Sequence, residues 1–347
     1  MKSAHIPLLF ASLASAHSAV SSVIFDGTRY PARDARMDRD FNARRIEWNF
    51  KDMNGFPWLA VNDVQDPAIT CGLSPTPPEL TAVARAGSEV TVQWSGIIQM
   101  HYGPVLTYLG KWEPGMTPQE VNFFKIKGNG FDTAQKKWAN EELIDTHTAD
   151  TMKIPSDIPP GTYILRTELL ALHGNTLSST PVAGGGPQFY THCFNVNITS
   201  NGTATPSPTV RFPGGYKRED PGVAYAPMRN RNTWSEYIVP GPAVYKGVYG
   251  TPVGERKVVE LKDTGAFPPE VEKEYEQFKK DNDAWAAKTH TWFNKIDPHG
   301  NGGADAPKSD AEPAAQFIAE HLKEGEALKV RQKELKAKMV KLGIANP

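Results

Sequence analysis

The first residue with the means to do chemistry is His17. Residues 1–16 have the pattern of a secretory signal, with Lys2, an apolar stretch over 6–13 and the small residues Ala14-Ser15-Ala16 at its end. Cleavage after residue 16 would give His17 a free α-amino group, so one residue would offer two nitrogens to a metal. With a second imidazole from inside the fold, these nitrogens form the planar set that suits Cu(II). The simpler interpretation is that cleavage merely leaves some residue first.

Two stretches further along the chain hold candidate polar side chains. His101 opens the run His101-Tyr102-Gly103-Pro104-Val105, in which a Gly-Pro turn would give a histidine at the mouth of a strand a defined direction. Taken alone, such a histidine is more often structural than a metal ligand. Gln188 and Tyr190 are two residues apart, so on a strand they share a face. An amide and a phenol side by side favour a polar site over a core.

The elements that position these residues are predicted to be β-strands. Short apolar runs alternate with Gly/Pro turns, and few helical stretches separate them. This pattern predicts an all-β fold, an antiparallel immunoglobulin/fibronectin-like sandwich with long surface loops, and disfavours a parallel α/β sheet. The expected strands are Val20–Phe25, Glu89–Ser95, Gly103–Leu109, Val121–Lys127, Thr162–Leu172 and Gln188–Ile198.

Two further segments are expected to surround the sandwich. Residues 28–52 mix many Arg and Asp residues without a strand period, which predicts a long surface loop. Residues 203–250 are rich in Pro and Gly, yet they carry too many aromatics for a disordered linker. We therefore expect an extended strap that packs on the sandwich.

Beyond residue 245 the pattern changes to helices. After Pro268-Pro269, apolar or tolerant residues recur at alternating four- and three-residue steps, as on one face of a helix, and a second amphipathic run follows from Phe317 to Leu342. The predicted organisation is a signal peptide over 1–16, a sandwich domain over 17–245, and a partly flexible C-terminal α-helical extension over 246–347.

Composition limits the classes of partner. The 38 basic and 39 acidic residues nearly cancel, so neither nucleic acid nor an anionic surface is expected as the main partner, and no apolar run after Leu13 is long enough to span a membrane. In a secreted, extracellular chain the two cysteines, Cys71 and Cys193, most simply form one disulfide. Asn197 and Asn201 each begin a glycosylation sequon.

Taken together, several motifs resemble the fungal lytic polysaccharide monooxygenases of auxiliary activity family 9, formerly glycoside hydrolase family 61. They span about residues 17–245 in the family's order. Besides an N-terminal His, they are the segments Asp66–Cys71, His101–Val105, Phe124–Ile126, Pro159–Arg166, Ala171–His173, Gln188–Cys193, Phe212–Tyr216, Asp220–Gly222 and Pro240–Pro242.

The resemblance implies a copper enzyme. His17 and His101 would form a copper "histidine brace" with Tyr190 in the axial position, and His173 and Gln188 would orient and protonate the oxygen species. The expected reaction is hydroxylation of a C–H bond beside a β-1,4 glycosidic link in cellulose or hemicellulose. Its co-substrate would be O2 or H2O2, and its electrons would come from a small-molecule or enzymatic donor.

Two alternatives remain at this point. The charged segment 28–52, and Met228 near the place of the family's exposed aromatic, suggest a secreted copper-binding protein of the same fold that handles copper or modifies the cell surface without cutting polymer. A hydrolase with paired carboxylates is less favoured, because no acidic pair stands out in the sequence.

Overall fold

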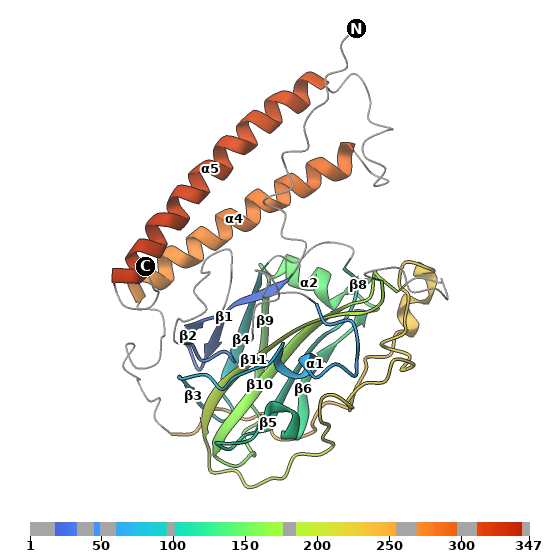
Figure 1. Cartoon of the computed structure of the whole chain (residues 1–347), viewed down its shortest axis with the longest axis vertical. Coiled ribbons are helices and arrows are strands. Elements are labelled where there is room, and N and C mark those ends of the chain that lie inside the picture. Colours follow the sequence, from blue (N-terminus) through green and yellow to red (C-terminus); the bar gives the residue numbers. More distant parts are fainter. Residues whose placement is uncertain are drawn as a thin grey trace. The chain divides into compact units, whose positions relative to one another are not determined.

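A computed structural model of the chain describes residues 18–32, 45–48, 60–95, 101–175, 185–254, 269–296 and 311–341. The expected signal sequence and His17 lie outside these residues. The described residues form two compact units, a sandwich unit up to residue 254 and a helical unit from residue 269. Figure 1 shows the strands of the first unit and the two long helices of the second.

The sandwich consists of two sheets, which confirms the predicted fold class. The smaller has the strand order β2-β1-β4-β9, and all its pairs are antiparallel. The larger has the order β3-β11-β10-β5-β6, in which β3 runs parallel to β11 and the other pairs are antiparallel. The strands are β1 (Ala19–Phe25), β2 (Thr28–Pro31), β3 (Ala82–Arg85), β4 (Glu89–Ser95), β5 (Val105–Lys111), β6 (Phe123–Asn129), β9 (Ala149–Lys153), β10 (Gly161–Ala171) and β11 (Gln188–Thr199).

Both faces of the larger sheet are covered. Alternate residues of β10, such as Leu165 and Leu169, pack with Val92 and Trp94 of β4 to form the core between the sheets. The residues between them face outward, where a second apolar cluster is closed by the strap, and Tyr216 is one of the strap residues in it. The predicted packing of the strap on the sandwich is therefore confirmed.

One local expectation was wrong. Residues 28–31 form β2, although the whole of 28–52 was expected to be a surface loop. Arg29 is buried in this strand because its Nη1 donates a hydrogen bond to Ser22 Oγ over 2.7 Å, so its polar head is satisfied inside. Residues 45–48 of the same segment are also buried. The rest of the segment lies outside the described residues.

Small elements and one disulfide complete the sandwich unit. Cys71, at the end of α1 (Ala68–Cys71), is joined to Cys193 of β11, as the sequence predicted. The remaining elements are η1 (Pro118–Glu120), β7 (Phe131–Asp132), β8 (Lys137–Trp138), α2 (Ala139–Asp145) and η2 (Arg231–Glu236), and β7 pairs with β8.

The helical unit is a pair of long amphipathic helices, α4 (Pro269–Ile296) and α5 (Ala311–Lys341). The ring of Trp285 stacks on His321 with centroids 4.5 Å apart, and its Nε1 donates to the His321 carbonyl. Ion pairs such as Lys288–Glu324 and Arg331–Asp281 join the two helices at their surface. Among the described residues, no helix combines the length and apolar character needed to cross a membrane.

Candidate metal centre

The start of β1, which comes just after His17 in the sequence, pairs with the end of β4, and His101 comes shortly after β4. At the start of β1, Ala19 pairs with Ser95, the last residue of β4, and Val20 pairs with Trp94. His101 follows β4 after only a short segment that lies outside the described residues. His17 comes shortly before β1 in the sequence and lies outside the described residues.

Backbone contacts with the end of β10 fix the segment that carries His101. The amide of Leu172 donates to the Tyr102 carbonyl over 2.8 Å, and that of Leu170 donates to the Pro104 carbonyl over 3.1 Å. Between them, Gly103 lies so close to β10 that a Cβ there would stand 1.8 Å from the Leu170 carbonyl oxygen. Only glycine fits at this position, so the approach of the two backbones sets the place of His101.

The same contact brings His101 and His173 together. Their ring centroids are 4.0 Å apart and their planes are inclined by 40°. His173 Nδ1 is buried and has no hydrogen-bond partner among the described residues. Burial lowers the pKa of His173, which favours the neutral imidazole. Behind it, Asn175 Nδ2 donates to the carbonyls of Val223 and Tyr225, which ties the turn after β10 to the strap.

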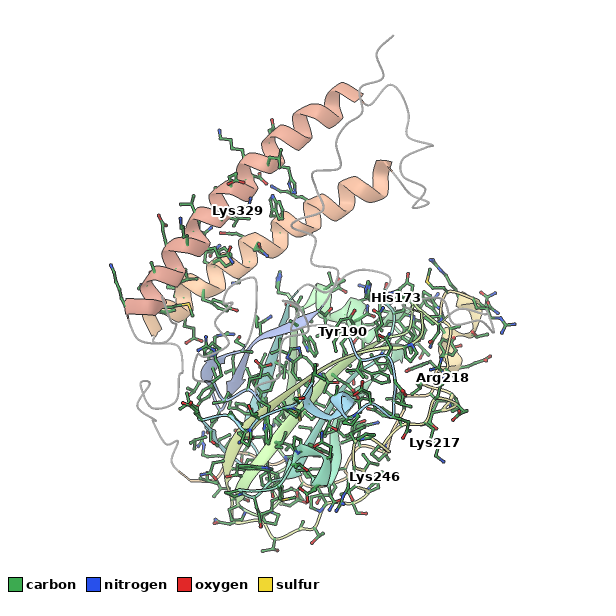
Figure 2. The ribbon with its side chains drawn as sticks, viewed as in Figure 1. His173, Tyr190, Lys217, Arg218, Lys246 and Lys329 are labelled. Atoms are coloured by element: carbon green, nitrogen blue, oxygen red, sulfur yellow. A yellow bond between two sulfur atoms is a disulfide. The ribbon has the colours of Figure 1, made fainter. Side chains whose placement is uncertain are left out.

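Gln188 and Tyr190 begin β11 at the same end of the sheet. Gln188 pairs with Ala171 and Tyr190 with Leu169, so both are close in register to the turn that holds His173. Figure 2 shows His173 and Tyr190 at this end of the sandwich. The Tyr190 hydroxyl donates to Gln188 Oε1 over 2.8 Å, which confirms that the two side chains share a face.

The surroundings of Tyr190 differ from the expected polar site. Its side chain is only 3% exposed and packs in the apolar core between the sheets. Burial raises the pKa of Tyr190 to about 12, so its phenol is protonated at neutral pH. Tyr190 thus presents a neutral oxygen at the edge of the core.

The donor types at this end of the sandwich fit copper. Neutral imidazole suits copper and zinc, whereas Ca²⁺ and Mg²⁺ prefer sets of oxygen ligands. Within the described ranges, no three His, Cys, Asp or Glu residues gather as a metal site. A complete site therefore needs further donors, and an amino-terminal His17 with its amine and imidazole would provide two.

Sequence reasoning missed an aromatic cluster beneath His101. Tyr102 lies with its ring centroid 4.9 Å from that of Trp234 in η2, and Trp138 is 5.8 Å from Trp234. Tyr225 and Tyr237 of the strap also pack on Trp138. The abundance of aromatics in the strap was the available signal, but it did not say which strand end they cover.

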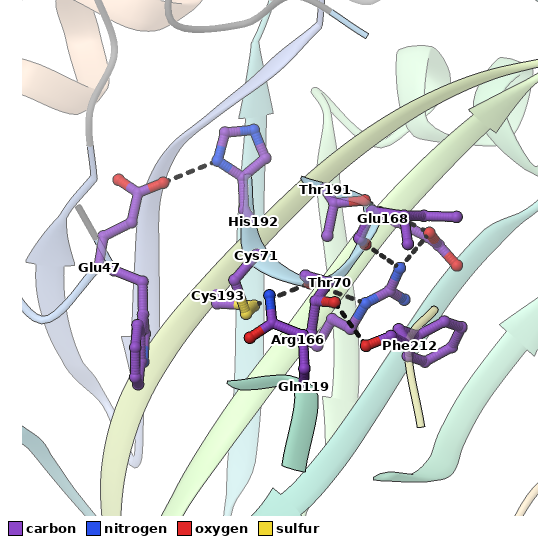
Figure 3. The surroundings of a disulfide bond; sticks show 12 residues. Glu47, Thr70, Cys71, Gln119, Arg166, Glu168, Thr191, His192, Cys193 and Phe212 are labelled. Carbon is purple, nitrogen blue, oxygen red and sulfur yellow. Dashed lines mark hydrogen bonds and ion pairs between the residues drawn. A yellow bond between two sulfur atoms is a disulfide. The ribbon is translucent and has the colours of Figure 1, made fainter. Parts of the chain in front are cut away.

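A buried charged network was also missed. Arg166 and Glu168 on the outward face of β10 are fully buried and form an ion pair over 2.7 Å. Glu168 accepts a short hydrogen bond from Tyr216, and Arg166 donates to the carbonyls of Ile69 and Thr70 in α1, as Figure 3 shows for Thr70. These bonds hold α1, the strap and β10 together behind the site.

Comparison with known proteins is consistent with this geometry. Residues 17–237 match the model of Auxiliary Activity family 9, formerly GH61. The chain is 37% identical over 246 residues to lytic polysaccharide monooxygenase B of Geotrichum candidum, a match that covers 69% of this chain and 64% of that protein. It is 33% identical over 249 residues to monooxygenase A of the same organism, covering 70% of this chain and 81% of that one.

Solved structures show the same fold. The extended catalytic domain of LPMO9A from H. jecorina is 28% identical and superposes with a TM-score of 0.56, covering 70% of this chain and 96% of that one. Cel61B from Hypocrea jecorina is 26% identical, also with a TM-score of 0.56, and covers 66% and 100% of the two chains. Since the family model matches the greater part of the chain, this protein belongs to Auxiliary Activity family 9, whose named relatives here are lytic polysaccharide monooxygenases.

Proposed function

We propose that this protein is a secreted, copper-dependent enzyme that cleaves β-1,4-linked polysaccharide oxidatively. The observation that carries the proposal is the close pair of His101 and His173, 4.0 Å apart at the strand ends where Gln188 and Tyr190 also lie, in a member of this family. In this pair His101 is the candidate metal ligand and His173 is the candidate proton donor. The proposed catalytic domain spans 17–245, and 246–347 is proposed as a separate extension.

The proposed metal ligands are His17, His101 and Tyr190. His17 would contribute its amine and imidazole after signal cleavage, and His101 the second imidazole. Tyr190 would present its protonated phenol to the same ion. Copper held by these residues would supply one-electron redox chemistry.

The surrounding residues would handle the co-substrate and its protons. Gln188 accepts the hydrogen bond from the Tyr190 hydroxyl with its Oε1. Its amide N–H groups are donors, and they would donate to the oxygen co-substrate. His173 is neutral, and a neutral imidazole can give one proton and take one back. Water is kept from the protein side of the site because Tyr190 is packed into the core.

The proposed reaction is balanced with either co-substrate. A C–H bond and O2, with two electrons and two protons from an external reductant and solvent, give C–OH and water. With H2O2, the same C–H bond gives C–OH and water without further electrons. When the hydroxylated carbon bears the glycosidic oxygen, the C–O bond to that oxygen breaks, the new hydroxyl becomes a carbonyl, and its proton passes to the oxygen of the sugar that leaves.

The proposed substrates are cellulose and hemicellulose, and the proposed electron donor is a small molecule or another enzyme. Met228 is 48% exposed, and a thioether there offers a softer apolar contact than an aromatic ring. The proposed glycan acceptors Asn197 and Asn201 are both exposed.

The test is mass spectrometry of the soluble products from a panel of cellulose, xyloglucan, glucomannan and xylan. Copper-loaded mature protein is incubated with each polymer and ascorbate, and His101→Ala protein serves as the matched control. Oxidised oligosaccharides that need both copper and His101 support the proposal. Copper binding without products from any polymer contradicts it and favours the alternative of a copper-handling protein.

A further inference from the structure

A second buried histidine, His192, contacts the strand that follows His17. His192 lies on β11, two residues after Tyr190 and on the same face of the strand. Its Nε2 accepts a hydrogen bond from the backbone amide of Val20 over 3.3 Å, although the two residues belong to different sheets. The start of β1 is therefore tied across the core to the strand that carries Tyr190.

Glu47 fixes which way the His192 ring presents its nitrogens. Glu47 Oε1 lies 2.7 Å from His192 Nδ1, and the Glu47 side chain is completely buried. Because the Val20 amide can only donate, Nε2 must act as the acceptor. Nδ1 then carries the proton and donates it to the carboxylate, so Glu47 selects the tautomer that can receive Val20.

Glu47 is itself held in place by β11. The Trp48 amide donates to the Cys193 carbonyl, and the Asn195 amide donates to the Ile46 carbonyl, each over 2.9 Å. These bonds place Glu47 beside His192 next to the disulfide, as Figure 3 shows. The Trp94 ring packs edge-on against the His192 ring, with centroids 5.7 Å apart.

We infer that His192, oriented by Glu47, is a positioning residue that fixes the start of β1 and thereby the place of the amino-terminal metal ligand. The inference rests on the proposed function, because it concerns the geometry of that copper site. His17 and Val20 are three Cα–Cα steps apart in the sequence, and three steps span at most about 11 Å. A fixed Val20 would therefore limit how far the His17 nitrogens can lie from the start of β1.

If His192 and Glu47 only stabilised the fold, an apolar pair of residues could take their place. Burying a carboxylate and a histidine has a desolvation cost, and an apolar pair of similar volume often packs at least as stably. What an apolar pair does not offer is a directional acceptor for the Val20 amide. A positioning role and a purely structural role therefore predict different results. Only the positioning role predicts a change in Val20 amide exchange together with a change in Cu(II) binding.

The test compares three variants of the full mature chain. His192→Leu keeps bulk but removes the acceptor, whereas His192→Gln keeps an acceptor near the position of Nε2. Tyr163→Phe is the control, because it removes only the hydrogen bond from the Tyr163 hydroxyl to the Pro159 carbonyl, and Tyr163 pairs with Val196, four residues further along β11 than His192. Hydrogen exchange of the Val20 amide is measured without metal, and Cu(II) affinity and the EPR spectrum are measured with it.

His192→Leu is expected to speed hydrogen exchange of the Val20 amide, to weaken Cu(II) binding by about ten-fold and to alter the EPR spectrum. Loss of a residue that orients a metal ligand typically weakens metal binding by about this factor. His192→Gln should recover most of both, and Tyr163→Phe should match the native protein. Equal Val20 exchange and equal copper affinity in His192→Leu and Tyr163→Phe would overturn the inference. Absence of copper binding by the native protein would instead refute the proposed function, since the exchange measurement needs no metal.

Discussion

The imidazole rings of His101 and His173 lie with their centroids 4.0 Å apart, although one precedes β5 and the other follows β10. Their places are set by the backbone, because the Leu172 amide binds the Tyr102 carbonyl directly beside both of them. The pair is thus positioned by ladder-like hydrogen bonds at the end of a sheet.

His173→Ala is expected to leave copper affinity within a few-fold of the native value but to lower turnover about a hundred-fold. The reason is that His173 is proposed to move a proton, and general acid–base groups typically contribute about 10²–10⁴-fold in rate. Product formation and copper titration measure the two quantities separately. Unchanged turnover in this variant would remove His173 from the proposed machinery.

Gly103→Ala is expected to weaken copper binding at least about ten-fold, because its Cβ would meet the Leu170 carbonyl oxygen at 1.8 Å and the His101 segment must move away. Gly115→Ala is the control. It is strained by a φ of +96°, but a Cβ there meets nothing within 4 Å. Copper affinity equal in the two variants would show that the approach of Gly103 to β10 does not position His101.

Replacing Cys71 and Cys193 by Ser is expected to lower the free energy of unfolding by about 4–5 kcal/mol. The disulfide closes a loop with a sequence separation of 122, and a cross-link of that length mainly reduces the entropy of the unfolded chain. Guanidinium unfolding of the oxidised native protein and the double variant gives the difference. A loss below about 1 kcal/mol would contradict a major stabilising role.

Stability is expected to be lost above about pH 10. Burial, and then the charge of Glu168, raise the pKa values of Tyr108, Tyr216 and Tyr237 above that of an ordinary tyrosine. A group whose pKa is higher in the folded state stabilises fully below its unfolded pKa, about 10, and that contribution falls as the pH rises further. Tyrosinate absorbance should therefore appear together with unfolding, and titration of these phenols in a folded protein would contradict it.

Much of the fold could be predicted because its strands alternate regularly. β4 begins and ends where the pattern placed it, whereas β5 starts at Val105 instead of Gly103, since Pro104 has no amide for the ladder. β2 was missed because Arg29 looks exposed in sequence and is buried by its bond to Ser22. The parallel pairing of β3 with β11 has no local signal at all.

The site was less accessible to sequence reasoning. The alternation of Gln188 and Tyr190 predicted their shared face, but nothing in their spacing places His173 against His101. That expectation came from the resemblance to a family. Glu47 and His192 escaped notice because Glu47 lies in a segment whose charges looked solvated, whereas its side chain is buried against His192.

The central claim is that an amino-terminal His17 and His101 bind one copper ion. The most direct measurement is Cu(II) titration of the metal-free mature protein with EPR detection, beside a protein that carries one extra residue before His17 and a His101→Ala variant. The account predicts one tightly bound copper with nitrogen hyperfine structure in the native protein, and a much weaker, altered site in both others. The same tight site and spectrum in all three proteins would contradict it.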